Sequence, residues 1–135
     1  MDYSKLTQLN VNCIKTSELK DISFMLSGCG GLTSLDVFKF DTKNIENMSG
    51  IFQNLGYLES LRVINIGTNE VTAMSYIFQS CSKIKELDTS KLDTNNGEDK
   101  YYMFGGCWAL TKLNVTNFKK SKATDMCHIF RKFWY

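Results

Sequence analysis

The chain has 135 residues, 43% of them hydrophobic, with a formal net charge of +2. This length predicts one domain over residues 1–135, and the near-neutral charge excludes a generally basic nucleic-acid-binding protein. No stretch approaches the roughly 18 apolar residues of a membrane span, and no signal peptide is expected because residues 1–5 have no basic segment leading into an apolar one.

A pattern recurs along the whole chain, and its leading apolar residue returns every 26 positions, as Leu6, Leu32, Leu58, Ile84 and Leu110. Self-similarity at a fixed period of this size predicts a solenoid, in which each unit stacks on the next. The repeats run over 6–31, 32–57, 58–83, 84–109 and 110–135. Residues 26 positions apart are referred to below as one column.

Each repeat begins with a predicted strand. In the second repeat, Leu32, Leu35 and Val37 are apolar among polar neighbours, and Phe40 closes the run. Alternation with a period of two is typical of a short strand with one buried face. Stacking the repeats would place five such strands side by side in a parallel sheet.

A polar corner and a predicted helix follow each strand. Thr42 and Lys43 suit a turn that caps a helix. Apolar residues then recur at spacings of three and four, as Ile45, Met48, Ile51, Phe52 and Leu55. This stripe predicts a helix of two to three turns. A helix is about 10 Å wide against a strand spacing of about 4.8 Å, so we expect the stack to curve with its sheet on the concave face.

The run over 32–52, Leu-x-x-Leu-Asp-Val-x-x-Phe-Asp-Thr-x-x-Ile-x-x-Met-Ser-x-Ile-Phe, resembles the BspA-like leucine-rich repeats of bacterial and protist surface proteins. The resemblance implies an α/β leucine-rich-repeat-type solenoid of five strand-corner-helix units. It further implies a cell-surface or secreted protein that binds proteins or attaches cells to host or matrix molecules, without catalysis. Five reduced cysteines would also be compatible with a cytoplasmic location.

The fourth repeat departs from the pattern between Asn95 and Tyr102. Gly97 and Lys100 fall where the helix requires apolar residues, so we expect a loop that delays the helix until Tyr101. This loop is interpreted either as a binding loop flanked by two tyrosines or as simple repeat decay, which a stack tolerates.

Three of the five cysteines, Cys29, Cys81 and Cys107, share a column with Leu55 and Phe133. A column shared by cysteine, leucine and phenylalanine predicts core packing. Cys81 and Cys107 lie close enough in adjacent repeats for a disulfide, but the odd number of cysteines argues against one. We therefore expect all five, including Cys13 and Cys127, to be reduced.

The titratable residues give no sign of catalysis or metal binding. Cys127 and His128 are adjacent, and neighbours one apart on a helix point in different directions, so they do not form a nucleophile-base pair. Two aspartate pairs share columns, namely Asp36 with Asp88 and Asp41 with Asp93. Each pair is two repeats apart, too far for a calcium cage, and we expect these carboxylates to bond backbone amides. No catalytic, cofactor-binding or metal-binding residue is predicted, and no cofactor or enzymatic activity is expected.

The outward strand positions are the candidate partner-binding surface. Phe38 and Ile64 form an apolar pair in neighbouring repeats, with Asp36, Arg62 and Asp88 around them. An apolar pair inside a charged rim is typical of a protein hot spot. The alternative is that exposed apolar residues are ordinary on strands.

The C-terminal repeat carries a second candidate surface. It is basic, with six Lys or Arg against one acid from Leu110 onward, and such a surface could attract an anionic partner. It closes on aromatic and basic residues that either cap the stack or form an end interface, namely Phe130, Arg131, Phe133, Trp134 and Tyr135.

The sequence therefore predicts a non-enzymatic module that holds a protein or glycan ligand, for example a host or matrix protein, on its concave face. The alternative is a structural assembly subunit that associates with itself through its open repeat ends. Neither hypothesis involves nucleic acid or a membrane span.

Overall fold

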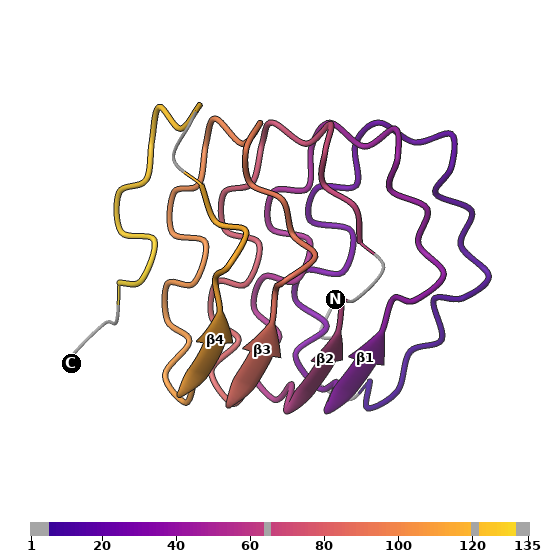
Figure 1. Cartoon of the computed structure of the whole chain (residues 1–135). Helices are drawn as coiled ribbons and strands as arrows, with labels where there is room; N and C mark the ends of the chain where they lie inside the picture. Colours follow the sequence, from indigo (N-terminus) through magenta and orange to yellow (C-terminus); the bar gives the residue numbers. More distant parts are fainter. Residues whose placement is uncertain (1–5, 64–65, 120–121, 132–135) are drawn as a thin grey trace.

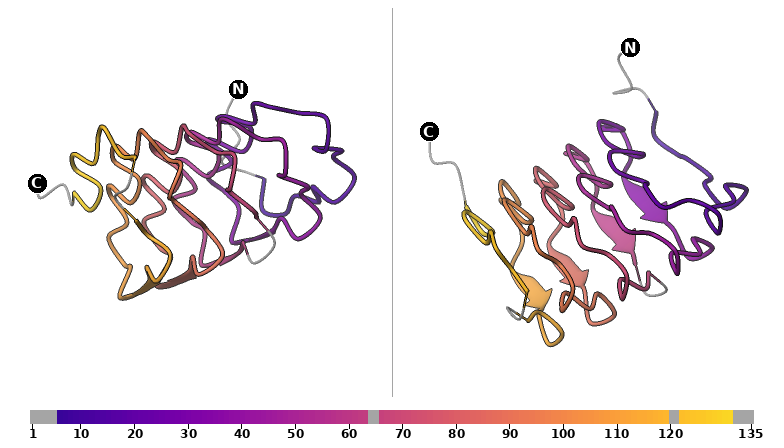
Figure 2. Two further views of the ribbon diagram at one scale, coloured as in Figure 1. Left: turned by 45° about the horizontal axis from the view of Figure 1, so that its top comes forward. Right: turned by 90° about the horizontal axis from the view of Figure 1, so that it is seen from above.

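In the computed structural model, which describes residues 6–63, 66–119 and 122–131, the chain forms a stack of similar coils that follow one another in sequence order (Figures 1 and 2). Isolated parallel bridges join the same column in successive coils, from Asp21 to Asn47, Ala73, Asp99 and Asp125. The coils therefore stack in a register of 26 residues. No helix within the described residues is long and apolar enough to cross a membrane.

Four short strands lie along one side of the stack: β1 (Ser34–Asp36), β2 (Ser60–Arg62), β3 (Glu86–Asp88) and β4 (Lys112–Asn114). β1 pairs with β2 and β3 pairs with β4, both in parallel, and β2 contacts β3 without a hydrogen-bonded ladder. The expected single sheet of five strands is therefore wrong. The described residues form two sheets of two strands, and the first coil contributes none.

The predicted helix after each corner is also wrong, because the described residues contain no helix. The strand-corner-helix unit, and with it the helix-containing leucine-rich-repeat-type solenoid, is replaced by a coil made of strands and turns. The sheet was expected on a concave face because a helix is wider than a strand. Since the described residues contain no helix, this argument for curvature does not apply. In place of the helix, each coil has a turn segment, residues 48–54 in the second coil.

Left-handed backbone explains why the turn segment cannot be helical. One column has φ between 53° and 60° in all five coils, at Phe24, Gly50, Tyr76, Tyr102 and His128. A second column, Gly28, Asn54, Ser80 and Gly106, also has positive φ. A right-handed helix cannot continue through such a residue, so the turn segments of the first four coils are each interrupted twice.

The amides of the turn segment bond the next coil instead of their own. In the second coil, Gly50 N donates to Ser75 O at 2.8 Å and Phe52 N to Ile77 O at 3.0 Å, whereas Gln53 N donates to Gly50 O at 3.0 Å. Amides along the turn segment therefore alternate between donating to the neighbouring coil and closing a local β-turn through an i to i−3 bond. This arrangement satisfies the buried backbone without the i to i−4 bonds of a helix.

The apolar columns form the core as predicted. Leu32, Leu35, Val37 and Phe40 are at most 4% exposed, and the residues of the supposed helix stripe from Ile45 to Leu55 are at most 1% exposed. A stack of parallel rings runs through the coils, with centroids 5.3–5.6 Å apart and planes within 16°, over Phe52, Phe78, Phe104 and Phe130. The spacing of three and four thus identified the buried face correctly, although turns and not a helix produce it.

The corner threonines connect neighbouring coils. Thr42 Oγ1 donates to Gly67 O at 2.7 Å and Thr68 Oγ1 to Asp93 O at 2.6 Å, and both side chains are buried. They were expected to cap a helix, but the hydroxyl bonds a carbonyl of the next coil. A carbonyl of the next coil is satisfied at these two corners in this way.

Candidate functional site

The outward residues of β1 and β2 bring three of the predicted partner-binding side chains together. Arg62 lies opposite Asp36 in the parallel register, and Arg62 Nη1 is 3.7 Å from Asp36 Oδ2. The Arg62 guanidinium carbon is 5.7 Å from the centre of the Phe38 ring, which is 47% exposed. We call the exposed side of β1–β4 and the residue pairs that follow each strand the strand face.

Asp36 also fixes the backbone that carries Phe38. Its Oδ1 accepts a hydrogen bond from Phe38 N at 2.8 Å, a bond typical of an Asx turn. The same carboxylate therefore orients the phenylalanine and neutralises the arginine. Ile64, the other half of the expected apolar pair, lies outside the described residues.

Asp88 belongs to the second half of the strand face. It lies opposite Asn114, and its Oδ1 accepts from Ser90 N at 2.9 Å, a hydrogen bond that lowers the pKa of the Asp88 carboxyl. Beside it, Lys112 Nζ is 3.1 Å from Glu86 Oε2, and a shallow hollow of about 370 Å³ lies over β3 and β4. Sequence reasoning did not single out the Glu86–Lys112 pair, although its opposite charges 26 residues apart were a usable signal.

The shared aspartates bond backbone amides, as predicted. Asp41 Oδ1 accepts from Lys43 N at 3.2 Å, and Asp93 Oδ1 accepts from Asn95 N at 2.9 Å, in the same way as Asp36 and Asp88. Among the described residues, no group of three or more His, Cys, Asp or Glu could hold a metal ion.

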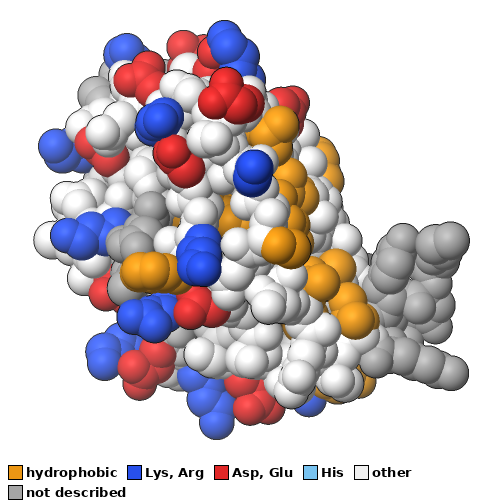
Figure 3. All heavy atoms as spheres, turned by 90° about the vertical axis from the view of Figure 1, so that its right-hand side faces the viewer, with side chains coloured by type: hydrophobic (Ala, Val, Ile, Leu, Met, Phe, Trp, Pro, Cys, Tyr) orange, Lys and Arg blue, Asp and Glu red, His pale blue; other side chains and the backbone are white. Residues whose placement is uncertain are grey.

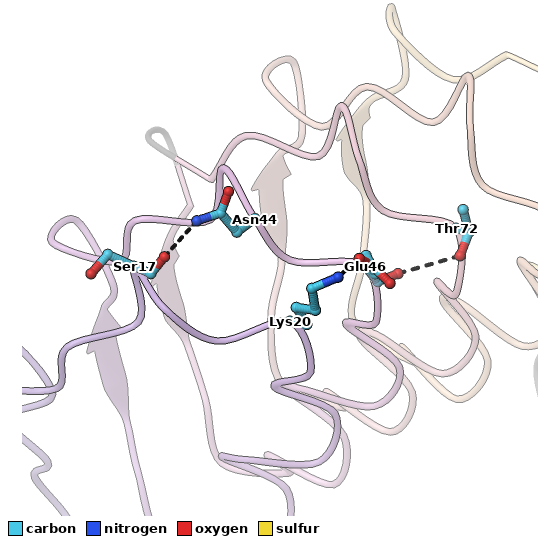
Figure 4. Close-up of polar contacts among 5 residues, drawn as sticks. All are labelled: Ser17, Lys20, Asn44, Glu46 and Thr72. Atoms are coloured by element: carbon cyan, nitrogen blue, oxygen red, sulfur yellow. Dashed lines mark hydrogen bonds and ion pairs between the residues drawn. The ribbon is translucent and has the colours of Figure 1, made fainter.

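One ion pair and two hydrogen bonds connect adjacent coils between the corner and the turn segment (Figure 4), and we call this set of contacts the charged ladder. Lys20 Nζ is 2.7 Å from Glu46 Oε1 in the next coil, Asn44 Nδ2 donates to Ser17 O at 2.7 Å, and Thr72 Oγ1 donates to Glu46 O at 3.4 Å. Each contact links adjacent coils, so this ladder supports the stack. Exposed ion pairs of this kind contribute little stability.

The cysteines are all free thiols, as expected. Cys81 and Cys107 are buried, and their thiols donate to Phe52 O and Phe78 O at 3.1 and 3.0 Å. Burial raises the pKa of Cys107 to about 12 and raises that of Cys81 as well. These two thiols pack as core residues, whereas Cys13 and Cys127 are exposed.

The irregular fourth coil contains a buried lysine that sequence reasoning missed. The Lys100 side chain is 0% exposed, in the column of Met48 and Met74, and its Nζ donates to Gly97 O at 2.6 Å. A Cβ at Gly97 would lie 3.1 Å from Lys100 Cε and 2.7 Å from Met74 Sδ. Glycine at position 97 therefore makes room for the lysine, and burial lowers the pKa of the amine.

An aromatic cluster on the turn segments of the last three coils was also missed. Its members are Tyr76, Tyr101, Tyr102, His128 and Arg131. Ring centroids within it are 4.7–6.3 Å apart, and the Arg131 guanidinium carbon is 6.0 Å from the Tyr102 ring. His128 is exposed and packs edge-on against the tyrosines. Comparing the columns of Tyr101 and Arg131 could have found this cluster from the sequence.

The predicted end interface is described only in part. Phe130 is 56% exposed and stacks on Phe104, and Arg131 lies against Tyr102, but Phe133, Trp134 and Tyr135 lie outside the described residues. An apolar hollow of about 220 Å³ opens between Phe104, Leu110, Leu113 and Phe130. The last described coil thus presents core side chains at its outer side.

Comparisons with known proteins give one result. The sequence matches the family described as "Mycoplasma protein of unknown function, DUF285", once over residues 3–61 and once over residues 20–133. No curated protein and no solved structure matches the chain.

Proposed function

Because the chain belongs to the DUF285 family of Mycoplasma proteins of unknown function, we propose that it is a non-enzymatic binding module of a BspA-like surface protein. It is exposed at the cell surface or secreted, and it holds a protein ligand, such as a host or matrix protein, on the strand face. The sequence resemblance of residues 32–52 to BspA-like repeats supports the surface location, and the family match covers nearly the whole chain.

The observation that carries this proposal is the contact of Asp36, Phe38 and Arg62. An exposed aromatic ring is covered by a guanidinium group, which a carboxylate holds in turn. Aromatic residues and arginine are the residue types most enriched at the energetic centres of protein interfaces. The Glu86–Lys112 and Asp88 side chains extend the surface with charges of both signs, which suits a polar rim.

The other coils show which side chains the fold accepts at the position of Phe38. Ser90 and Thr116 occupy the column of Phe38, so the fold accepts a small polar side chain there. Phe38→Ser should therefore leave the stack intact while removing the ring from the strand face. Phe24 is a matched control, because it is 49% exposed against 47% for Phe38 and lies in a turn segment.

The experiment measures binding of the purified chain to immobilised fibronectin, laminin and collagen by surface plasmon resonance. We expect one of these proteins to bind, with affinity reduced about tenfold or more by Phe38→Ser and Arg62→Ser but not by Phe24→Ser. Circular dichroism melts check that each variant is folded. Binding that is unchanged by Phe38→Ser, or an absence of binding to the whole panel, would contradict the proposal.

A second candidate function, a subunit that assembles through its ends, is favoured by the exposed core at both ends of the stack. The apolar hollow beside Phe130 lies at one end, and Figure 3 shows a band of apolar side chains on the side of the opposite end. Within the first coil, Phe24 and Met25 are exposed. A second copy of the chain could continue the columns there. Light scattering over a concentration series tests this function, which fails if the mass stays monomeric or if Phe130→Ser leaves an oligomer unchanged.

A further inference from the structure

The aromatic cluster of Tyr76, Tyr101, Tyr102, His128 and Arg131 arises from departures from the repeat, and the other coils serve as an internal reference. The column of Tyr101 holds serine in the three preceding coils, Ser23, Ser49 and Ser75. Ser49 and Ser75 are buried at 8% and 6% exposure, and their hydroxyls are 3.2 Å apart. A tyrosine in this small-residue column is larger than the stack requires, so packing alone does not account for it.

Gly105 is a second departure, and it fits the first. Its column holds Ser27, Gln53 and Gln79 in the earlier coils and Arg131 in the last. A Cβ at Gly105 would lie 2.3 Å from Cδ1 of Tyr102, so the absent side chain leaves the space that the Tyr102 ring fills. Arg131 then enters the same column one coil later and lies against that ring. Two columns, that of Tyr101 and that of Gly105 and Arg131, thus change together.

The backbone of the cluster takes the left-handed conformation that its column has in every coil. Tyr76, Tyr102 and His128 have φ of 60°, 53° and 58°, a conformation that costs a residue with a Cβ roughly 1 kcal/mol or more. Gly50 takes the same conformation in the second coil without that cost.

We propose that the aromatic cluster binds a carbohydrate. A sugar ring offers an apolar C–H face that packs on aromatic rings, and hydroxyl groups that accept from arginine and exchange hydrogen bonds with tyrosine and histidine. The tyrosines, the imidazole and the guanidinium of the cluster provide both kinds of contact within one small area. The site is a surface platform for a saccharide that stacks on it.

The size of the cluster separates this ligand from a protein. The cluster consists of five residues, its ring centroids lie within 6.3 Å of their neighbours, and Tyr102 is only 7% exposed, so the cluster offers a small contact area. A stable protein interface needs about 800 Å² from each partner. In the column of Gly105 and Arg131, the second and third coils carry polar side chains that bond each other, since Gln53 Nε2 donates to Gln79 Oε1. This inference does not depend on the proposed role of the strand face.

The repeat also suggests the variants for the test. Tyr101→Ser and Arg131→Gln install residues that the same columns already carry in other coils, at Ser75 and Gln79. Tyr57→Ser is the matched control, because Tyr57 is 58% exposed and lies outside the cluster. Each variant is first checked for wild-type melting behaviour.

The probe is a printed array of neutral, N-acetylated and sialylated oligosaccharides, followed by calorimetric titration of the best binder. We expect at least one class of oligosaccharide to bind. Tyr101→Ser should weaken the affinity for that oligosaccharide about tenfold, and Arg131→Gln should weaken it several-fold. Tyr57→Ser and Phe38→Ser should leave the affinity unchanged. An array without binders, or glycan binding that survives Tyr101→Ser, would overturn the assignment. It would also be overturned if the chain bound no glycan but bound an enzymatically deglycosylated matrix protein, and Tyr101→Ser abolished that binding.

Discussion

Replacing Lys100 with methionine is the most direct test of how the irregular fourth coil is built. Lys100 is wholly buried in a column that holds Met48 and Met74, and the hydrogen-bond partner of its amine is the Gly97 carbonyl. An ammonium group carries three donors, and one neutral acceptor compensates only part of its lost hydration. Lys100→Met keeps the length of the side chain and removes the buried polar group. We therefore expect the variant to be more stable than wild type.

The magnitude follows from two opposing contributions. Removing a poorly compensated buried polar group recovers about 1–3 kcal/mol, and losing the hydrogen bond to Gly97 O costs about 1 kcal/mol. The net gain at neutral pH is about 1 kcal/mol in the free energy of unfolding, which corresponds to a rise of about 3 °C in melting temperature for a chain of this length. Urea denaturation followed by circular dichroism measures the difference, with exposed Lys85→Met as the control that should change nothing.

The dependence on pH gives the stricter test. Burial lowers the pKa of Lys100 in the folded state below its ordinary value of 10.5, so between these two pKa values the unfolded chain binds more protons than the folded chain. Stability of the wild type therefore rises with pH through that window, and Lys100→Met lacks this contribution. The advantage of the variant should be largest near neutral pH and should shrink as the pH approaches 10.5. A variant less stable than wild type, or an advantage independent of pH, would refute this reasoning.

Three further predictions concern the stack. Phe78→Ala should lower the free energy of unfolding by about 3–5 kcal/mol, because Phe78 is 0% exposed and lies between two stacked rings. Thr68→Val should cost about 1 kcal/mol in the same denaturation assay, since it leaves the carbonyl of the next coil without its hydroxyl donor. With a thiol-reactive disulfide reagent at neutral pH, Cys13 should react in the native state, whereas Cys107, whose pKa is about 12, should react only on unfolding.

Each of these predictions has a contrary outcome. Phe24→Ala is the control for the ring stack, and equal losses from Phe24→Ala and Phe78→Ala would show that the stack adds nothing to the core. A Thr68→Val variant as stable as wild type would mean that the corner carbonyl finds another donor. Labelling of Cys107 at the rate of Cys13 would show that the fourth coil opens readily.

The buried faces could be predicted from the sequence because each apolar column repeats several times. The same comparison predicted that Cys81 and Cys107 are core residues and that the aspartates accept hydrogen bonds from backbone amides. The structure confirms both predictions. Asp36, Phe38 and Arg62 could be placed together because one strand register fixes all three.

The helices could not be excluded from the sequence, because only some of the residues that prevent them, such as Gly50 and Gly106, carry a local signal. Tyr76, Tyr102 and His128 adopt a left-handed conformation that glycine or asparagine usually marks. Spacings of three and four are shared by a helix and by turns that alternate between local and inter-coil hydrogen bonds. Lys100 is predicted to lie in a loop because it falls where a helix would require an apolar residue, and the space that Gly97 leaves for its side chain depends on the three-dimensional packing.

The register of 26 residues also governs how the length of such a chain can change over evolution. Backbone bridges connect Asp21, Asn47, Ala73, Asp99 and Asp125 in one line, so every coil presents the same donors and acceptors to the next. Removing or duplicating a whole repeat, such as 58–83, rejoins equivalent residues and preserves each line of bonds. Inserting a single residue puts part of one coil out of register with its neighbours by one position and turns the core side chains of that part outward. Recombination in the gene is therefore tolerated in whole repeats, and a chain of this kind gains or loses exposed surface one coil at a time.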